Sequence, residues 1–308
     1  MQLETPASRP ETRAVRWKKV TLVGVGLLGG SLGLALRRRR LAESVMGFVR
    51  RKASVTECRR ADAVSHATLD LREAVSGAEL IVLCTPISQM RGLCEGMLPW
   101  LERGAIVTDV GSVKGSLVRD LEPLLAGAGV WFVGSHPMAG SERTGVAAAQ
   151  ESLFEGAVCV VTPTRHSRGA AVGRVERLWK SVGARVLRLS PAAHDALVSR
   201  SSHLPHVLAT QLVNLVLRTG NAKAQAALCA NGFRDTTRIA SGSPEMWRDI
   251  AMANRENLLS ALTSFEEGLG EFKRALRSGN DRAISRLFEQ ARQRRDAWAA
   301  GAGSPSPE

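Results

Sequence analysis

The sequence predicts an α/β protein with a doubly wound parallel sheet, followed by a second region that is entirely α-helical. Two observations support this fold class. Short β-rich runs alternate with helical stretches over residues 17–190, and no such runs occur over residues 191–300. Strand–helix alternation is typical of a parallel sheet with helices on both faces. We therefore expect two domains with these bounds, and disordered tails at residues 1–16 and 301–308.

The first domain contains seven expected strands, each a short run of apolar and β-branched residues. Leu80-Ile81-Val82-Leu83 shows no polar alternation, as expected for a parallel strand that is buried on both faces. Amphipathic stretches such as Val113–Leu125 and Ala170–Val182 lie between strands. The expected strands are Val20–Val23, Val45–Val49, Leu80–Cys84, Ala105–Thr108, Val130–Val133, Val158–Val161 and Arg185–Leu189.

The second domain shows helical spacing over Pro191–Leu217 and Glu245–Trp298. Pro205 lies within the first stretch and should cap or kink a helix there. Helices this apolar must pack on the sheet domain or on a partner subunit. Offsets of three and four separate Leu258, Leu259, Leu262, Phe265 and Leu269.

Composition places the 308-residue chain among ordinary globular proteins, with 44% hydrophobic and 23% charged residues. No apolar run reaches the ~18 residues that a membrane-spanning helix needs. The amino terminus lacks the apolar segment of a signal peptide, so we expect a cytoplasmic protein that does not enter a membrane. No two of the five cysteines form a C-x-x-C pair, which favours free thiols over a disulfide framework or a zinc site.

The formal net charge is +13, from 42 Lys and Arg against 29 Asp and Glu. The arginines are spread along the chain, and their densest run, Arg37–Arg40, ends a predicted helix, where cations complement the helix dipole. This distribution favours a solvated basic surface over a nucleic-acid site. It also suits anionic ligands such as a phosphate-bearing cofactor or a dicarboxylate.

The run GVGLLG at residues 24–29 closes the first expected strand and opens a helix. In that context G-x-G-x-x-G indicates a dinucleotide-binding domain of the Rossmann type. Gly24 permits the tight turn, Gly26 lets a pyrophosphate approach the backbone, and Gly29 lets helix and strand pack closely. Free N–H groups at the helix start, around Leu27 and Leu28, would then bind the phosphates.

The end of the second expected strand bears on the choice of cofactor. An NAD enzyme usually has an Asp or Glu there to accept hydrogen bonds from the ribose 2′-OH. This chain has Val49 at that place, followed by Arg50 and Arg51. An acid would repel a 2′-phosphate, whereas arginines bind one well. The cofactor is therefore expected to be NADP or NAD, with NADP favoured. The alternative is that both arginines begin a solvated helix and NAD binds without the acid.

Three further segments follow expected strands, where a doubly wound sheet places its ligands. They are Cys84-Thr85-Pro86, DVGSVK at Asp109–Lys114, and GSHPMAGSE at Gly134–Glu142. His136 lies among small residues that leave room for a ligand. The ordinary histidine pKa near 6.5 suits proton abstraction at neutral pH.

With two segments of the helical domain, these motifs resemble the prephenate/arogenate dehydrogenase family. The resemblance spans about residues 17–275, and the motifs occur in the same order in both domains. The matching segments are 24–29, Thr85-Pro86, 109–114, 134–140, SHLPH at 202–206, GFRDTTRIA at 232–240 and PEMWRD at 244–249.

The resemblance implies oxidative decarboxylation of prephenate to 4-hydroxyphenylpyruvate in tyrosine biosynthesis, and a homodimer formed by the helical domain. His136 would assist deprotonation of the substrate's C4 hydroxyl, Ser112 would orient that hydroxyl, and Arg238 would hold a carboxylate. Positions that would line or organise the substrate pocket are Ser141, Glu142, His206, Asp235 and Trp247. Thr85, Pro86 and Asp109 would join the glycine loop and the two arginines in the cofactor site.

Several alternatives stay open. Arogenate carries an amine where prephenate has a keto group, and no residue of the sequence decides between an enzyme for either substrate and a cyclohexadienyl dehydrogenase for both. A hydroxyacid dehydrogenase or imine reductase would have a catalytic lysine in the helical domain. A silent NADP-sensing module would not need His136 and Arg238. His203 and His206 could share a helix face, but no further ligands accompany them, so no metal is expected.

Overall fold

The computed structural model describes residues 16–141, 143–218 and 222–302. The chain divides at Arg255 into two compact units, the larger one containing the sheet and most of the helices. The expected tails at residues 1–15 and 303–308 lie outside the described residues. Gly301 and Ala302 belong to the last helix instead of to the expected tail.

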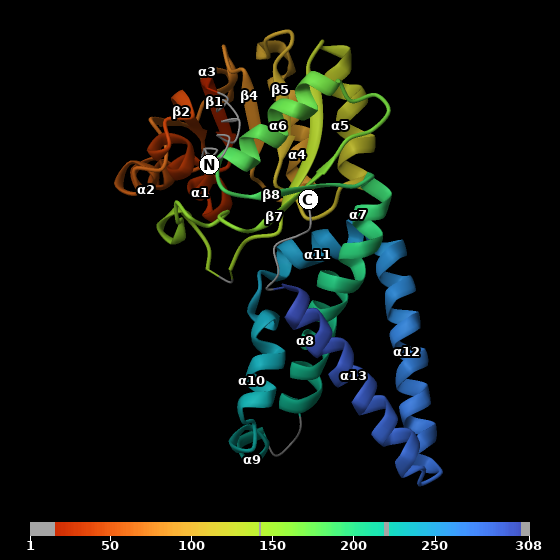
Figure 1. Ribbon diagram of the computed structural model, residues 1–308. Helices are drawn as coiled ribbons and strands as arrows, with labels where there is room; N and C mark the ends of the chain where they lie inside the picture. Colours follow the sequence, from red (N-terminus) through yellow and green to blue (C-terminus); the bar gives the residue numbers. More distant parts are fainter. Residues whose placement is uncertain (1–15, 142, 219–221, 303–308) are drawn as a thin grey trace, which may run out of the picture. The chain divides into compact units, whose positions relative to one another are not determined.

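Eight strands form one sheet in the order β3-β2-β1-β4-β5-β6-β7-β8 (Figure 1). All neighbours are parallel except β6 and β7, which are antiparallel. The doubly wound α/β fold is thus confirmed, with one reversal that the strand pattern did not predict. The strands are β1 (Trp17–Val23), β2 (Ala42–Phe48), β3 (His66–Thr68), β4 (Leu80–Leu83), β5 (Ile106–Asp109), β6 (Trp131–Pro137), β7 (Val158–Thr162) and β8 (Arg185–Arg188).

Two strands differ from the sequence prediction for a physical reason. β3 was not predicted, because its three residues contain no apolar run and gain their strand geometry by pairing with β2. β6 was expected to end at Val133 but continues to Pro137. Its parallel pairing with β5 ends at Val133, and its antiparallel pairing with β7 begins at Gly134.

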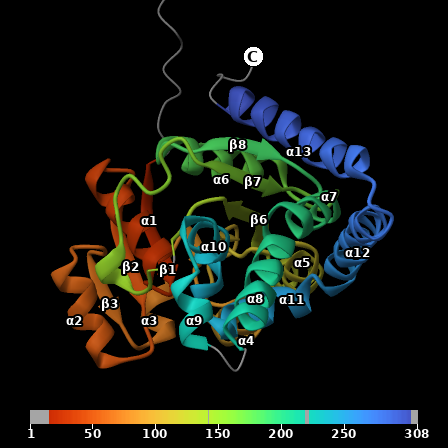
Figure 2. The same cartoon turned by 90° about the horizontal axis from the view of Figure 1, so that it is seen from below.

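Helices cover both faces of the sheet (Figures 1 and 2). On β4, Leu80 and Val82 pack in one core with α1 and α6, while Ile81 and Leu83 pack in the other with α3, α4 and α5. Apolar residues thus follow one another along β4 because each face has its own helical cover. The helices and helical turns of this part are α1 (Leu27–Arg38), α2 (Lys52–Arg60), α3 (Leu71–Val75), α4 (Ile87–Met97), η1 (Leu98–Trp100), α5 (Gly115–Gly127), η2 (Val146–Ala148) and α6 (Gly169–Ser181).

The chain after the sheet is helical, as predicted. Pro205 is the second residue of α8 and follows a π-helical turn, η3. A proline ring clashes with the carbonyl one turn earlier in a regular α-helix, and the wider turn relieves that clash. The elements are α7 (Pro191–Val198), η3 (Ser199–His203), α8 (Leu204–Leu217), α9 (Ala222–Ala227), α10 (Asn231–Thr237), η4 (Arg238–Ser241) and α11 (Pro244–Ala253).

The smaller unit contains α12 (Arg255–Arg277) and α13 (Asp281–Ala302). The rings of Phe272 and Phe288 meet edge to face, with their centroids 5.8 Å apart. This unit leaves several large apolar side chains exposed, which is uncommon for a surface in contact with water alone. They are Leu259, Leu269, Leu276, Phe288 and Trp298.

A fully buried ion pair between Lys114 and Asp109 lies at the point where β6 stops pairing with β5. Asp109 Oδ1 accepts the amide N–H of Ser135 at 3.0 Å, and Lys114 Nζ donates to the Ser135 carbonyl at 2.8 Å. These contacts satisfy the backbone groups that a neighbouring strand would otherwise pair. The ion pair thereby holds β6 in place beyond the end of β5.

Lys114→Met should lower the free energy of unfolding by about 3–5 kcal/mol, because it leaves the Asp109 carboxylate buried without its partner. The double variant Asp109→Asn/Lys114→Met, which removes both charges, should recover most of that loss. Urea unfolding measures both values. Lys180→Met, at an exposed lysine of α6, is the control. A loss below about 1 kcal/mol for Lys114→Met would contradict this account.

Candidate functional site

The turn from β1 into α1 has the geometry that a dinucleotide needs. Gly24 adopts φ +98°, where other residues are strained. A Cβ on Gly29 would lie 2.1 Å from the Gly24 carbonyl oxygen, so helix and turn touch there. A Cβ on Gly26 would meet nothing within 4 Å, which leaves its outer side open to a ligand.

The start of α1 offers N–H groups to an anion. The helix begins at Leu27, and Gly26 before it has no side chain to cap the first turn. The first N–H groups of a helix have no acceptor within the helix, and they bind phosphate well. The residues present therefore fit the pyrophosphate of a dinucleotide.

Arg50 and Arg51 lie beside this turn, as predicted from the sequence. They line a cavity of about 470 Å³ together with Gly26 and with Ser54 and Glu57 of α2. Val49 follows the last residue of β2. Its side chain is buried and apolar, so it cannot accept the ribose hydrogen bonds that an acid would accept there. The cavity thus presents two arginines at the place where an adenosine ribose would lie.

A second pocket, of about 260 Å³, opens at the carboxyl ends of β4 and β5. In a doubly wound sheet of this strand order, that place holds the nicotinamide half of a dinucleotide. The predicted residues Leu28, Thr85, Pro86 and Ser112 all line it. Its opposite wall comes from α11 and the residue before it, with Ser243, Met246, Asp249 and Ile250.

Asp109 was also expected to bind the cofactor, but it does not line either pocket. Its side chain is fully buried. The carboxylate accepts the Gly111 N–H at 2.8 Å as well as the contacts from Lys114 and Ser135. Its effect on the cofactor loop is therefore structural.

A third pocket, of about 310 Å³, contains the predicted residues Arg238, Ser141, His206 and Trp247. The His206 and Trp247 rings stack with their centroids 3.5 Å apart and their planes 26° apart. Met246 lines this pocket and also the one beside β4 and β5. A ligand near Arg238 would therefore adjoin a ligand near Thr85.

Two predicted substrate residues are not placed in this pocket. Asp235 is exposed on α10 and is not among the residues that line it. Glu142 lies outside the described residues. The assignments of Glu142 and Asp235 to the substrate pocket stay predictions.

His136, on β6, belongs to a chain of hydrogen bonds that the sequence did not predict. Asp195 Oδ1 accepts from Nδ1 of His194 at 2.8 Å. In the tautomer of His194 that carries its proton on Nδ1, Nε2 accepts from Nδ1 of His136, 2.9 Å away. A carboxylate can only accept, so this order leaves Nε2 of neutral His136 as the unprotonated nitrogen.

The carboxylate of Asp195 is fixed by the backbone of α5. It accepts the N–H groups of Lys114 and Gly115, each at 2.8 Å. Asn254 donates from its side-chain amide to the Asp195 carbonyl at 2.8 Å. The only sign of this hydrogen-bond relay in the sequence was the adjacent pair His194-Asp195, which lies in α7, the helix after the last strand.

His136 is electrostatically different from a histidine in water. Burial holds its pKa well below the usual value, and His194, Lys114 and His203 lower the pKa further as nearby cationic or protonatable groups. The sequence-based expectation assumed an ordinary pKa near 6.5. The structure instead favours a neutral imidazole across the whole neutral range.

His203 and His206 do not form a metal site together. His206 stacks on Trp247, whereas His203 is buried, and its Nδ1 lies 3.2 Å from the Asn254 amide nitrogen. Burial lowers the pKa of His203 to about 4. Among the described residues, no three or more His, Cys, Asp and Glu side chains are arranged to hold a metal ion.

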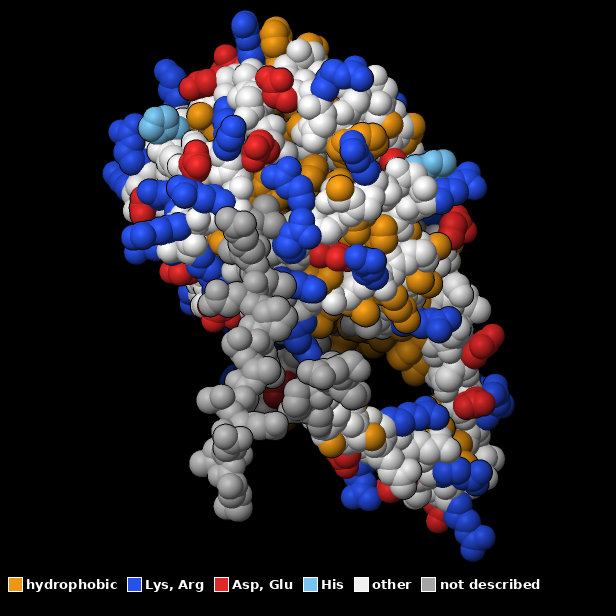
Figure 3. Space-filling model, turned by 45° about the horizontal axis from the view of Figure 1, so that its top comes forward, with side chains coloured by type: hydrophobic (Ala, Val, Ile, Leu, Met, Phe, Trp, Pro, Cys, Tyr) orange, Lys and Arg blue, Asp and Glu red, His pale blue; other side chains and the backbone are white. Residues whose placement is uncertain are grey.

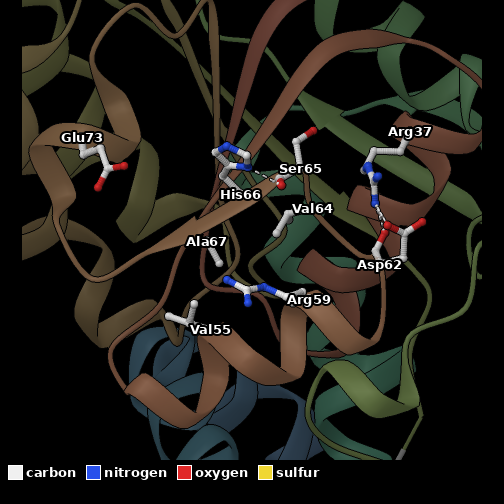
Figure 4. Close-up of a pocket in the computed structure, with 9 residues that line it drawn as sticks. All are labelled: Arg37, Val55, Arg59, Asp62, Val64, Ser65, His66, Ala67 and Glu73. Carbon is white, nitrogen blue, oxygen red and sulfur yellow. Dashed lines mark hydrogen bonds and ion pairs between the residues drawn. The ribbon is translucent and has the colours of Figure 1, made fainter.

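One further cavity, of about 370 Å³, lies away from these pockets. Figure 4 shows Arg59 and His66 near its centre, and Arg37 paired with Asp62 at one side. It opens near the beginning of β3 and the end of α1. Dinucleotides bind at the carboxyl ends of strands, so this cavity is not part of the cofactor site.

On the face seen in Figure 3, basic side chains are spread out instead of forming one patch. Figure 3 shows Lys and Arg side chains over the viewed face, with Asp and Glu side chains among them. This distribution fits the solvated basic surface that the sequence suggested. No helix among the described residues is long and apolar enough to span a membrane.

Comparison with known proteins identifies the family. Residues 32–188 match the model for the prephenate dehydrogenase nucleotide-binding domain, and residues 190–290 match that for the prephenate dehydrogenase dimerization domain. The chain belongs to the prephenate dehydrogenase family. It is therefore a dehydrogenase with an NAD-binding domain, and its helical region corresponds to the family's dimerization domain.

Individual relatives agree with this family assignment. The chain is 32% identical to the prephenate dehydrogenase of Bacillus subtilis over 90% of its own length and 75% of that protein. The crystal structure of prephenate dehydrogenase from Aquifex aeolicus, in complex with hydroxyphenyl propionate and NAD+, matches with a TM-score of 0.84 and 32% identity, over 91% of this chain and 98% of the other. Synechocystis arogenate dehydrogenase matches with a TM-score of 0.77 and 31% identity, over 91% and 99%.

The lowered pKa of His136 predicts how activity depends on pH. His136 is the proton acceptor that the family resemblance implies, and with a pKa well below 6.5 it stays unprotonated as the pH falls through 6.5. We expect kcat/KM to keep its neutral-pH value at pH 6.5 and to fall only at lower pH. Initial rates from pH 8 to pH 5, with circular dichroism to exclude unfolding, measure this. Loss of half the activity at or above pH 6.5 would contradict it.

Proposed function

We propose that this dehydrogenase oxidises and decarboxylates prephenate to 4-hydroxyphenylpyruvate in tyrosine biosynthesis. The observation that carries the proposal is the meeting of two pockets at Met246. One pocket lies where the sheet would hold a nicotinamide ring, and the other contains Arg238, which suits a carboxylate. His136 lies on β6, and the residues that follow β6 line the pocket that contains Arg238.

The proposed chemistry divides between the cofactor and the protein. The nicotinamide cofactor, when bound, accepts a hydride from C4 of the substrate. Nε2 of His136 accepts the proton of the C4 hydroxyl, and Ser112 orients that hydroxyl. The bond to the ring carboxylate then breaks, CO2 leaves, and its electron pair completes the aromatic ring as a phenolate. The phenolate takes the proton back from His136, which gives the hydroxyl of 4-hydroxyphenylpyruvate.

The relay explains why His136 suits this role. Asp195 fixes the orientation of His194, and His194 in turn fixes the tautomer of His136. The burial that keeps His136 neutral leaves the lone pair of Nε2 free to accept a hydrogen bond from the C4 hydroxyl at neutral pH. Arg238 supplies a planar donor for a substrate carboxylate, beside the stacked rings of His206 and Trp247.

The direct test combines each of prephenate and arogenate with each of NAD and NADP, and follows the formation of reduced cofactor at 340 nm.

His136→Asn should lower kcat by roughly 10²–10⁴-fold, the usual contribution of a positioned acid–base group, and leave cofactor affinity unchanged. His166→Asn, at an exposed histidine outside the pockets, is the control. Near-normal turnover by His136→Asn would remove that residue from the mechanism. A folded, cofactor-binding protein that turns over neither substrate would refute the proposal.

Arogenate dehydrogenase activity is the second candidate, because a Synechocystis arogenate dehydrogenase matches over nearly its full length. The two substrates differ only in the side chain, which carries an amine in arogenate and a keto group in prephenate. Arg238, His206 and Trp247 could accompany either group. A dual-specificity cyclohexadienyl dehydrogenase would act on both, and the same assay separates the three.

We also propose that NADP is the preferred cofactor. Arg50 and Arg51 line the cavity beside Gly26, and the hydroxyl of Ser54 adds a donor to the same wall. A 2′-phosphate there would receive charge-assisted hydrogen bonds. Glu57 lines the cavity too, and its charge opposes the phosphate, so the arginines must outweigh it.

The double variant Arg50→Ala/Arg51→Ala should weaken NADP+ binding by about tenfold or more, the worth of one or two charge-assisted bonds. NAD+ binding should change less than about twofold, because NAD+ carries no 2′-phosphate. Calorimetric titration measures both affinities. Arg60→Ala, at an exposed arginine of α2 outside the cavity, is the control. An equal loss for both cofactors would contradict the assignment.

We also propose that the protein is a homodimer located in the cytoplasm. The exposed apolar side chains of α12 and α13 suit a subunit contact, so the helical region would form a homodimer. All five cysteines are free thiols, which favours the reducing cytoplasm.

A further inference from the structure

Asp249 faces the nicotinamide pocket from α11, with no role in the chemistry described above. Its side chain is 12% exposed. It is the only acidic residue among those that line this pocket, whose other residues are apolar or uncharged. A carboxylate in such surroundings interacts more strongly with a neighbouring charge than it would in water.

The carboxylate is held in place from both sides of the pocket. Oδ2 accepts a hydrogen bond from the hydroxyl of Ser88 in the first turn of α4. Oδ1 accepts from Nε and Nη2 of Arg248, at 3.1 and 2.8 Å. These hydrogen bonds, that of Ser88 first, hold the pKa of Asp249 below its usual value, so it is ionised at neutral pH.

Arg248 offsets this charge at the pocket only in part. Its side chain is 68% exposed, so water screens its charge, whereas Asp249 is largely enclosed. Lys114 and Asp109 lie deeper and neutralise each other. The pocket therefore presents one fixed negative charge to a ligand.

We propose that Asp249 makes this site favour the oxidised over the reduced form of its nicotinamide cofactor. The inference rests on the proposed placement of the nicotinamide ring between Thr85, Ser112 and α11. An oxidised nicotinamide ring carries one positive charge, and a reduced ring carries none. Only the oxidised ring is attracted to the carboxylate.

The attraction therefore changes during turnover. A hydride ion consists of one proton and two electrons. Its transfer to the ring neutralises the ring's positive charge. The phosphates and both riboses are the same in the two forms. Asp249 thus strengthens the binding of the reactant cofactor and contributes nothing comparable to the product cofactor, which assists its release.

The test compares the dissociation constants of the oxidised and reduced forms, measured by calorimetric titration without substrate. In Asp249→Asn, which keeps the side chain's shape and removes its charge, the oxidised form should bind about three- to tenfold more weakly. The reduced form should change less than twofold. Ser88→Ala removes the hydrogen bond and keeps the charge, so the ratio of the two constants should stay as in the wild type. Glu245→Gln, at an exposed acid on the same helix, is the matched control.

Equal changes for both forms in Asp249→Asn, or the same shift in Ser88→Ala, would overturn the inference. A wild-type protein that binds neither form would overturn the cofactor placement itself, so the two failures are distinct.

A salt titration of cofactor binding by the wild-type protein avoids any folding defect of the variant. Added salt should weaken the preference for the oxidised form, because it screens the attraction between ring and carboxylate. A preference that does not change with salt would count against it.

Discussion

The position of the proposed catalytic strand depends on one buried ion pair. Asp109 and Lys114 together bind both backbone groups of Ser135, the residue directly before His136. Taking two charges out of water costs several kcal/mol for each ion, so such a pair persists only where further hydrogen bonds satisfy it. Here Gly111, Ser135 and the pair itself supply those bonds.

The same segment also fixes the relay behind His136. The backbone N–H groups of Lys114 and Gly115 donate to Asp195, and His194 links Asp195 to His136. One short stretch between β5 and α5 therefore determines where β6 runs and how the imidazole is turned. Burial lowers the pKa of His136 most, and His194 and then Lys114 of this stretch lower it further. The stretch therefore contributes to both the geometry and the electrostatics at His136.

Local sequence patterns predicted the features that depend on local structure. The glycine spacing at residues 24–29 identified the turn, because φ at Gly24 and the contact at Gly29 are set within a few residues. Runs of buried residues identified seven of the eight strands. The short β3 and the reversal between β6 and β7 escaped prediction, because pairing between distant segments decides both.

The residues of the candidate site also fall into two groups, those that local motifs predicted and those that contacts between distant segments determine. Motif residues such as Arg50, Thr85 and Arg238 lie in pockets where the sequence suggested them. His194 and Asp195 were missed, because the contact between His136 and His194 spans 58 positions and leaves no periodic trace. The resemblance assigned Asp109, which follows an expected strand, to the cofactor site, and its burial against Lys114 indicates a structural role instead.

The shared wall at Met246 has a thermodynamic consequence. A ligand in either pocket restricts the same thioether side chain, which has several rotamers to lose. The second ligand then meets a wall that is already ordered, so each ligand alters the affinity of the other. Linkage requires that this coupling free energy be equal in both directions. If cofactor and substrate occupy these two pockets as proposed, each changes the affinity of the other by the same factor through Met246 of α11.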